Sequence, residues 1–234
     1  MNNADIAKAK EIPQAARSLF LETCDPEFKT SLKEIEIPAE GFRLAKTHLP
    51  HQFMKEHTKR DTKIIVEMRN PKDNLVSLYH FYRSNKVLGQ FKGSFSEWFQ
   101  LVKDKKIMNG DIIDFCVGWW NIRTRPNTLY VFYEDITEDP VREVRRMAEF
   151  LGKELSDEDV MKIAMWITLE NMSNGKSTNY EVLKEVVDFK ISPYMRKGKV
   201  GDWKTQMNDE ESKYVDQQCK NKCTPLGLNF RFEL

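Results

Sequence analysis

The stretch "VEMRNPKDNLVSLYHFYR", residues 66–83, begins as an apolar, β-branched run and ends as an amphipathic helical pattern. Arg69 stands where the expected strand ends, Asn70 suits a helix cap, and Pro71 suits a first helical position. A flexible turn would use Gly or Asn for backbone freedom, whereas this turn is stiff and presents a cation. Because the amino end of a helix carries partial positive charge, Arg69 and Ser77 predict a phosphate site there.

Strand patterns recur at residues 41–47, 62–68 and 128–134, and helical patterns separate them. This alternation predicts an α/β fold with a mainly parallel sheet flanked by helices on both faces. Polar clusters, "KTH", "RNPKD" and "YED", follow these strands. Because ligands of parallel sheets bind beyond the carboxyl ends of the strands, we expect one site at that edge. No Gly-, Ser- or Pro-rich linker divides the chain, so we predict a single domain over residues 1–234.

The charge and hydropathy of the chain disfavour several classes of partner. Lys plus Arg number 37 against 36 Asp plus Glu, which gives a net charge of +1. This balance leaves little counterion release for nucleic acid binding and no overall field for an acidic membrane. No apolar run approaches the roughly 20 residues of a membrane span, and the first residues lack the apolar stretch of a signal peptide. We therefore predict a cytoplasmic protein without a nucleic acid or membrane partner.

The cysteines do not indicate a metal site. Cys24, Cys116, Cys219 and Cys223 are scattered apart from the pair in "CKNKC", which has no matching second half for zinc. We interpret "CKNKC" as a solvated helix terminus and expect free thiols in a reducing compartment, with no metal. The kinase-type loop Gly-x-x-x-x-Gly-Lys-Ser/Thr is also absent, which disfavours ATP as a ligand.

The segment "LAKTHLP", residues 44–50, contains a candidate catalytic pair. Strand alternation puts Lys46 and His48 on the same side of an extended chain, about 6 to 7 Å apart. A nearby cation disfavours the charged imidazolium, which suits His48 to act as a general base near neutral pH. The alternative, which these two residues alone favour, is an ordinary solvated strand end.

Between residues 172 and 205 the regular patterns give way to "SNGKSTNY" and "RKGKVGDWK". A long irregular segment in a compact domain is usually functional or disordered. Arg196 and Lys197 beside Gly198 would let backbone and charge approach an anion together, although charged glycine loops are often simply solvated. Tyr133 could stack on or hydrogen-bond to a nucleotide base. The alternative is a half-buried tyrosine with a structural role. Phe81 follows Ser77 by one turn on the same side of the predicted helix. A place in the hydrophobic core is the alternative role for Phe81.

Together and in this order, "KTHLP", "RNPKDNLVSLYHFYR", "FYED" and "RKGKVGDWK" resemble the signatures of cytosolic sulfotransferases. The resemblance implies a P-loop-like sulfotransferase fold. It also implies transfer of a sulfonate group from 3′-phosphoadenosine 5′-phosphosulfate (PAPS), without a metal. The acceptor would be a hydroxyl or amine of a small, largely apolar molecule such as a phenol, alcohol, steroid or amine.

The resemblance also implies a role for individual residues. The residues that would bind the 3′-phosphate of the donor are Arg69, Ser77, Arg196, Lys197 and Gly198. Tyr133 would contact the adenine. His48 would take the proton of the acceptor, and Lys46 would stabilise charge on the group being transferred. Phe20 and Phe81 match aromatic positions of the acceptor pocket.

One departure from the family pattern concerns the start of the chain. Family members carry a strand and a phosphate loop of the form Pro-Lys-Ser/Ala-Gly-Thr-Thr-Trp, and no stretch of this sequence resembles it. We therefore expect the sequence to lack one βα unit of roughly 30 residues or more. Losing one oxyanion donor commonly costs about 10² to 10³ in rate. The alternative function is therefore a catalytically weak or inactive nucleotide-binding fragment of such an enzyme.

Two smaller departures concern the adenine and the oligomeric state. Ile167 and Leu169 stand where the family often has Thr and Phe near adenine, so that contact would be looser. The short dimer motif of the family, Lys-x-x-x-Thr-Val-x-x-x-Glu, would begin at Lys204. Its other positions are occupied by Asn208, Asp209 and Lys213. The resemblance thus allows a homodimer, but the motif does not predict one.

Overall fold

The computed structural model describes residues 19–20, 44–108, 110–176 and 178–234, with the backbone alone described at 19, 20 and 182. The strands are β1 (Leu19–Phe20), β2 (Ala45–Lys46), β3 (Ile64–Met68) and β4 (Thr128–Phe132). β1 pairs with β2 and β3 with β4, and both pairs are parallel. The predicted strands at 62–68 and 128–134 are confirmed over most of their length. Residues 41–43 of the other predicted strand lie outside the described residues.

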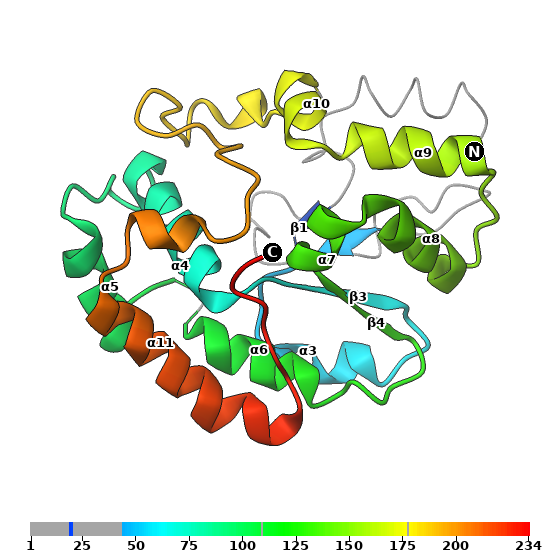
Figure 1. Cartoon of the computed structure of the whole chain (residues 1–234), viewed down its shortest axis with the longest axis horizontal. Helices are drawn as coiled ribbons and strands as arrows, with labels where there is room; N and C mark the ends of the chain where they lie inside the picture. The colour runs from blue at the N-terminus through cyan, green and yellow to red at the C-terminus, as the bar shows by residue number, and fades with distance from the viewer. Residues whose placement is uncertain (1–18, 21–43, 109, 177) are drawn as a thin grey trace.

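Helices cover both sides of β3 and β4, as predicted. In Figure 1, α3, α6 and α11 lie below these strands, whereas α8, α9 and α10 lie above them. The helices are α3 (His51–Thr58), α4 (Pro71–Ser84), α5 (Phe95–Lys103), α6 (Ile112–Trp120), α7 (Tyr133–Glu138), α8 (Pro140–Leu151), α9 (Asp157–Trp166), α10 (Leu169–Asn174) and α11 (Asp209–Lys222). Short 3₁₀ turns are η2 (Glu181–Leu183), η3 (Asp202–Thr205) and η4 (Thr224–Leu226). No helix of the described residues is long and apolar enough to cross a membrane.

The start of α4 follows the local signals of the sequence. Asn70 Oδ1 accepts a hydrogen bond from the Asp73 backbone N–H at 2.9 Å, and Pro71 is the first helical residue. The cap satisfies a backbone donor that the first helical turn cannot. The end of the predicted strand at 128–134 was wrong by two residues, because β4 ends at Phe132 and Tyr133 begins α7.

The main core lies on the α6 side of the strands. It joins Val66 and Met68 of β3 to Trp98 of α5 and Trp119 of α6, each at most 5% exposed. Because alternate strand residues point to opposite faces, Arg69 belongs to the other face of the strand. That face carries the site.

The interpretation of "CKNKC" as a solvated helix terminus was wrong for Cys223. Its side chain is 1% exposed and belongs to the main core, because the last turn of α11 packs against α6. Among the described residues, Cys116, Cys219 and Cys223 are free thiols, and Cys24 lies outside those residues. Burial raises the pKa of Cys116 to about 12, so this thiol stays protonated and unreactive at neutral pH.

Candidate anion site and catalytic pair

The ends of β3 and β4 place Arg69 next to Tyr133. Their register pairs Met68 with Phe132, so the residues that follow the two strands are neighbours. The Arg69 guanidinium carbon lies 4.2 Å from the centroid of the Tyr133 ring, which is a cation–π distance. The predicted site thus contains a charged side chain that lies over an aromatic ring.

Arg69 also contacts the late loop, which we define as residues 194–205. Arg69 Nη2 donates a hydrogen bond to the backbone oxygen of Lys199 at 3.2 Å and lies 3.9 Å from Asp73 Oδ2. Arg69 Nε is buried and has no acceptor among the described residues. A buried N–H without a partner costs about 1–3 kcal/mol. An anion placed against Arg69 would remove that cost.

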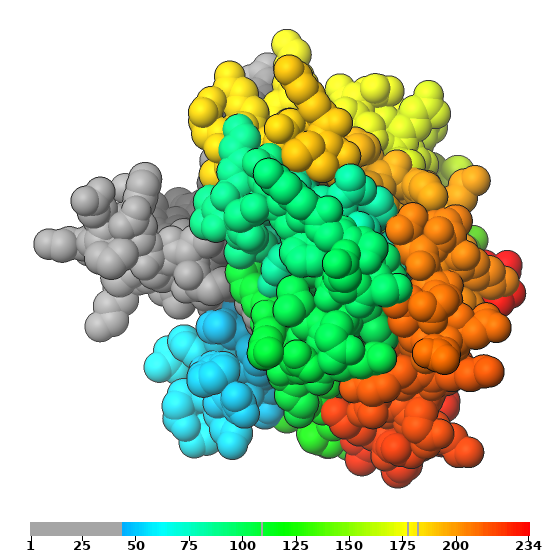
Figure 2. Space-filling view, turned by 90° about the vertical axis from the view of Figure 1, so that its left-hand side faces the viewer, coloured from blue at the N-terminus to red at the C-terminus, as the bar shows by residue number. Residues whose placement is uncertain are grey.

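Helix α4 turns one face toward the late loop. Asp73, Ser77 and Phe81 are spaced four apart and therefore lie along one side of the helix. At one end of this row Asp73 Oδ2 accepts a hydrogen bond from the Gly201 N–H at 2.8 Å. At the other end the Phe81 and Tyr194 rings meet edge to face, with centroids 6.5 Å apart. Ser77 therefore lies between two contacts with the loop. In Figure 2 the gold and orange chain that follows α10 lies beside the teal and green surface, which runs from the end of α4 through α5.

Two cations of the late loop share one carboxylate. Arg196 Nη2 forms an ion pair with Asp202 Oδ2, and Lys197 Nζ lies 2.6 Å from Asp202 Oδ1. Burial lowers the pKa of Arg196, an effect that Asp202 opposes and that the charge of Arg69 reinforces. The cations of the strand end and of the loop are therefore close enough to act on the same anion.

Gly198 cannot be replaced without strain. Its φ is +61°, a conformation that side chains rarely adopt. A Cβ at this position would also lie 3.0 Å from Leu169 Cβ and Leu169 Cδ2. The glycine thus allows the loop to pass tightly over the start of α10 while it carries the two cations before it.

The predicted catalytic pair lies on and after β2. Lys46 is half-buried, and burial lowers its pKa. His48 follows β2 and is exposed. Phe20 pairs with Lys46 in the β1–β2 register, but its side chain lies outside the described residues. A lysine two residues before an exposed histidine is an arrangement that suits charge stabilisation beside a general base.

A row of aromatic rings extends from α4 to Lys46. Tyr194 meets Phe81 on one side and stacks on Tyr180 on the other, with centroids 4.1 Å apart and an interplanar angle of 23°. Lys46 Nζ lies 5.9 Å from the centroid of the Tyr180 ring. The row joins the anion site to the catalytic pair. Sequence reasoning missed Tyr180 and Tyr194 because they lie in an irregular segment without periodicity, where aromatic side chains among polar residues were the only signal.

Comparison with known proteins shows the family. The sequence model of the sulfotransferase domain matches residues 1–227. Sulfotransferase 1C2 of Rattus norvegicus is 37% identical over 99% of this chain and 78% of its own length. Cytosolic sulfotransferase 1 of Danio rerio is 37% identical over 95% of this chain and 74% of its own length. The chain belongs to the sulfotransferase domain family.

Solved structures share the fold of this sulfotransferase. A complex of retinol dehydratase with retinol and PAP has a TM-score of 0.80 at 23% identity, over 98% of this chain and 75% of that chain. Mouse sulfotransferase SULT7A1 complexed with PAP has a TM-score of 0.75 at 24% identity, over 94% of this chain and 79% of that chain. The predicted sulfotransferase α/β fold is confirmed.

Glu67 lies close to the candidate site, and the sequence did not predict this. It lies on the same face of β3 as Arg69, opposite Val131 in the register. Its side chain is exposed to solvent, yet surrounding protein atoms raise its pKa, an effect that Arg69 and then His48 oppose. The carboxylate therefore lies within electrostatic reach of both the anion site and the candidate base. The signal in the sequence was a charged residue inside an otherwise apolar strand.

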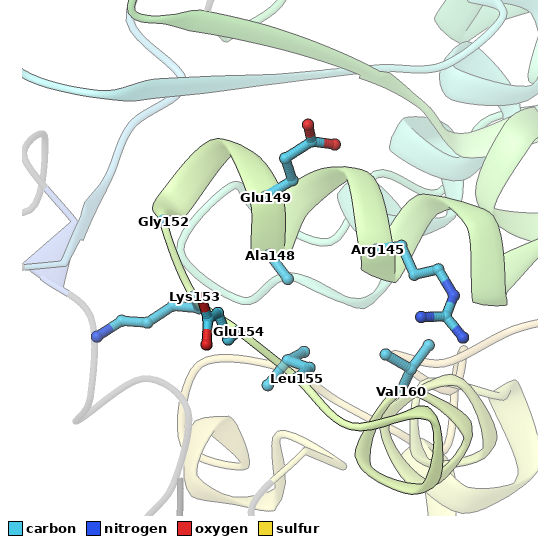
Figure 3. Close-up of a pocket in the computed structure, with 8 residues that line it drawn as sticks. All are labelled: Arg145, Ala148, Glu149, Gly152, Lys153, Glu154, Leu155 and Val160. Carbon is cyan, nitrogen blue, oxygen red and sulfur yellow. The ribbon is translucent and has the colours of Figure 1, made fainter.

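A hollow of about 430 Å³ between α8 and α9 contains none of the predicted site residues. Figure 3 shows Leu155 and Val160 on its floor, with Arg145 reaching toward α9 and Lys153 extending away. Its lining is Arg145, Ala148, Glu149, Gly152, Lys153, Glu154, Leu155 and Val160. In the part of the chain that the structure describes, no group of three or more His, Cys, Asp or Glu side chains is placed to hold a metal ion.

This sulfotransferase carries a neutral histidine beside the loop cations. Burial lowers the pKa of His80 to about 4. Asp202 opposes the shift, and the cations that add to it are Arg196, Arg83 and Lys197. His80 therefore stays uncharged well below neutral pH.

We expect His80 to make the fold less stable as the pH falls from about 6.5 to 4. An unfolded histidine takes up a proton near pH 6.5, whereas folded His80 does so near pH 4. Within that window the unfolded state binds more protons, so the free energy of unfolding decreases as the pH falls. Urea unfolding at pH 5 and pH 7 should show a smaller difference for His80→Gln than for the unchanged protein. His57→Gln, at an exposed histidine of α3, is the control, and an equal difference in both variants would contradict the prediction.

Proposed function

We propose that this chain transfers a sulfonate group from PAPS to a hydroxyl or amine of a small, largely apolar acceptor. The observation that carries the proposal is the meeting of cations from two distant segments. Arg69, at the end of β3, contacts the late loop that carries Arg196 and Lys197. Arg69 also keeps one buried donor unsatisfied within the described residues. A phosphate dianion with several oxygens is the kind of ligand that such a group of donors holds.

The nucleotide would bind along the face of α4. We propose that Arg69, Ser77 and the amide of Gly198 contact its 3′-phosphate. Arg196 and Lys197 would do so as well, and their joint contact with Asp202 supports this role because it shows both cations directed at the oxygens of one anion. Tyr133, which already packs against Arg69, would contact the adenine.

The transfer step would use the pair after β2. His48 would take the proton of the acceptor hydroxyl or amine while the oxygen or nitrogen of that group bonds to sulfur. The bond from sulfur to the 5′-phosphate oxygen breaks, and adenosine 3′,5′-bisphosphate leaves. Lys46 would stabilise the negative charge on the oxygens of the group in transfer. Phe81 and Phe20 would supply the apolar wall that positions the acceptor.

We further propose that residues 1–234 act as one cytoplasmic domain, without a metal and with small molecules as its partners. The balanced charge of +1 supports the absence of a nucleic acid partner. The unmatched dimer motif does not support a homodimer of the type found in the family.

Calorimetry with two nucleotides tests the proposed donor site. Adenosine 3′,5′-bisphosphate is expected to bind at least about tenfold more tightly than adenosine 5′-monophosphate. The reason is that one charge-assisted contact to the 3′-phosphate contributes about 1.5–3 kcal/mol. Equal affinities would show that the cations of the late loop and of β3 do not form a 3′-phosphate site.

A second candidate function is nucleotide binding without turnover. It needs only the cations of β3 and of the late loop, which meet around Arg69, and neither a base nor an acceptor. Purified protein incubated with PAPS and a panel of phenols, alcohols, steroids and amines separates the two candidates. Sulfonated product at ordinary enzyme rates supports the transferase, and tight nucleotide binding without product supports the second candidate.

A further inference from the structure

We propose that Asp73 is a positioning residue that sets the place of the late-loop cations relative to Arg69 through hydrogen bonds to the backbone on both sides of Asp202. The inference rests on the proposed function, because it assigns to Asp73 a part in recognition of the 3′-phosphate without contact to the nucleotide. Asp73 had no role in the sequence analysis.

The carboxylate of Asp73 is buried and accepts hydrogen bonds from two elements. Its side chain is 1% exposed. Oδ2 accepts from the Gly201 N–H and Oδ1 from the Trp203 N–H, each at 2.8 Å. Oδ2 also accepts from Asn70 Nδ2 at 2.9 Å. Charge-assisted bonds of this kind are about twice as strong as neutral ones, so Asp73 fixes the loop backbone firmly to the start of α4.

The two amides that Asp73 holds flank Asp202. Asp202 in turn pairs with Arg196 and with Lys197. The position of Asp202 therefore helps to fix the charged ends of both side chains. A shift of the loop relative to α4 would move them together, whereas Arg69 would stay with its strand.

The other end of the network is equally buried. Glu134 Oε1 accepts hydrogen bonds from the backbone N–H and the Nδ2 of Asn70, both at 2.9 Å. Asn70 and Glu134 are at most 1% exposed. The residue before Asn70 is Arg69, so the network fixes the turn that carries this arginine. A continuous line of hydrogen bonds thus joins α7, the turn with Arg69, Asp73 and the late loop.

The test compares the selectivity for a 3′-phosphate in Asp73→Asn and in the unchanged protein. Asparagine keeps the shape but replaces one acceptor oxygen by an NH₂ group, so one of the two loop amides loses its partner. We expect the affinity ratio of adenosine 3′,5′-bisphosphate to adenosine 5′-monophosphate to fall at least about tenfold. Hydrogen exchange of the Gly201 and Trp203 amides should become faster.

Asp111→Asn is the matched control. Asp111 caps α6 and likewise accepts from two backbone N–H groups, those of Ile113 and Asp114, at 2.8 and 3.1 Å. Both bonds go to Oδ1, which asparagine keeps, so this variant removes a carboxylate charge from a helix cap and should leave the affinity ratio unchanged. Asp73→Glu, which keeps the charge but displaces the loop, should lower the ratio as Asp73→Asn does. If Asp73→Asn does not fold, Asp73→Glu still tests the positioning role.

The outcomes separate the inference from the function on which it rests. If the unchanged protein prefers the 3′-phosphate and both Asp73 variants retain that preference, the positioning role alone is overturned. This holds even if amide exchange becomes faster. An unchanged protein without any such preference would overturn the proposed function and the positioning role together. A preference that falls in the Asp73 variants and persists in Asp111→Asn supports both.

Discussion

Replacing His48 by alanine is expected to lower the rate of sulfonate transfer by about 10² to 10⁴, the usual contribution of a general base. The affinity for adenosine 3′,5′-bisphosphate should stay the same, because the proposed nucleotide contacts come from β3, α4 and the late loop. Initial rates with PAPS and a phenol, together with calorimetry on the same preparation, measure both quantities. This split between rate and affinity is specific to a residue that acts on the acceptor.

His57→Ala is the matched control for His48. His57 is also an exposed histidine, but it lies in the last turn of α3. Its replacement should leave the transfer rate unchanged. A His48→Ala variant that keeps its full rate would remove this residue from the mechanism and leave another group to take the acceptor proton.

Replacing Arg69 by alanine is expected to weaken the binding of adenosine 3′,5′-bisphosphate by about tenfold to a hundredfold. A charge-assisted contact contributes about 1.5–3 kcal/mol, and each 1.4 kcal/mol is a factor of about ten in affinity. The binding of adenosine 5′-monophosphate should change much less, since that nucleotide has no 3′-phosphate. Calorimetric titration with both nucleotides measures the difference.

Arg123→Ala is a close control for Arg69→Ala. Like Arg69, Arg123 donates a hydrogen bond to a backbone oxygen and lies over an aromatic ring. Both the oxygen and the ring belong to Trp120. It lies between α6 and β4, outside the candidate site, and its loss should not affect either nucleotide. If Arg69→Ala binds adenosine 3′,5′-bisphosphate as the unchanged protein does, the phosphate site lies elsewhere.

The sequence predicted those parts of the fold that local chemistry decides. Asn70 and Pro71 mark the start of α4 because a cap and a fixed φ act within a few residues. The structure has the same kind of local signal at α8, where Pro140 is the first helical residue and Gly152, at φ +69°, is the C-cap. Arg69 was predicted to be a site residue because a cation at the end of a strand has no local structural reason.

The remaining parts of the site depend on contacts between distant segments. Asp73 reads as an ordinary residue in the first turn of a helix, and only the approach of Gly201, 128 positions later, gives it a second role. Tyr180 and Tyr194 stack because the irregular segment folds back on itself. Neither periodicity nor residue type reports such contacts, so the site predicted from the sequence did not include these residues.

The last residues of the chain lie against the back of this site. The backbone oxygen of Phe232 accepts a hydrogen bond from Trp203 Nε1 at 3.0 Å, and its ring lies 4.7 Å from Lys72 Nζ. Arg231 forms ion pairs with Asp135 and with Glu138 of α7. Glu233 Oε1 also lies 2.7 Å from Lys204 Nζ of the late loop, so residues fused directly after Leu234 would begin two positions from this contact. Recombinant protein for nucleotide titrations should therefore carry no fused residues after Leu234 once it has been purified.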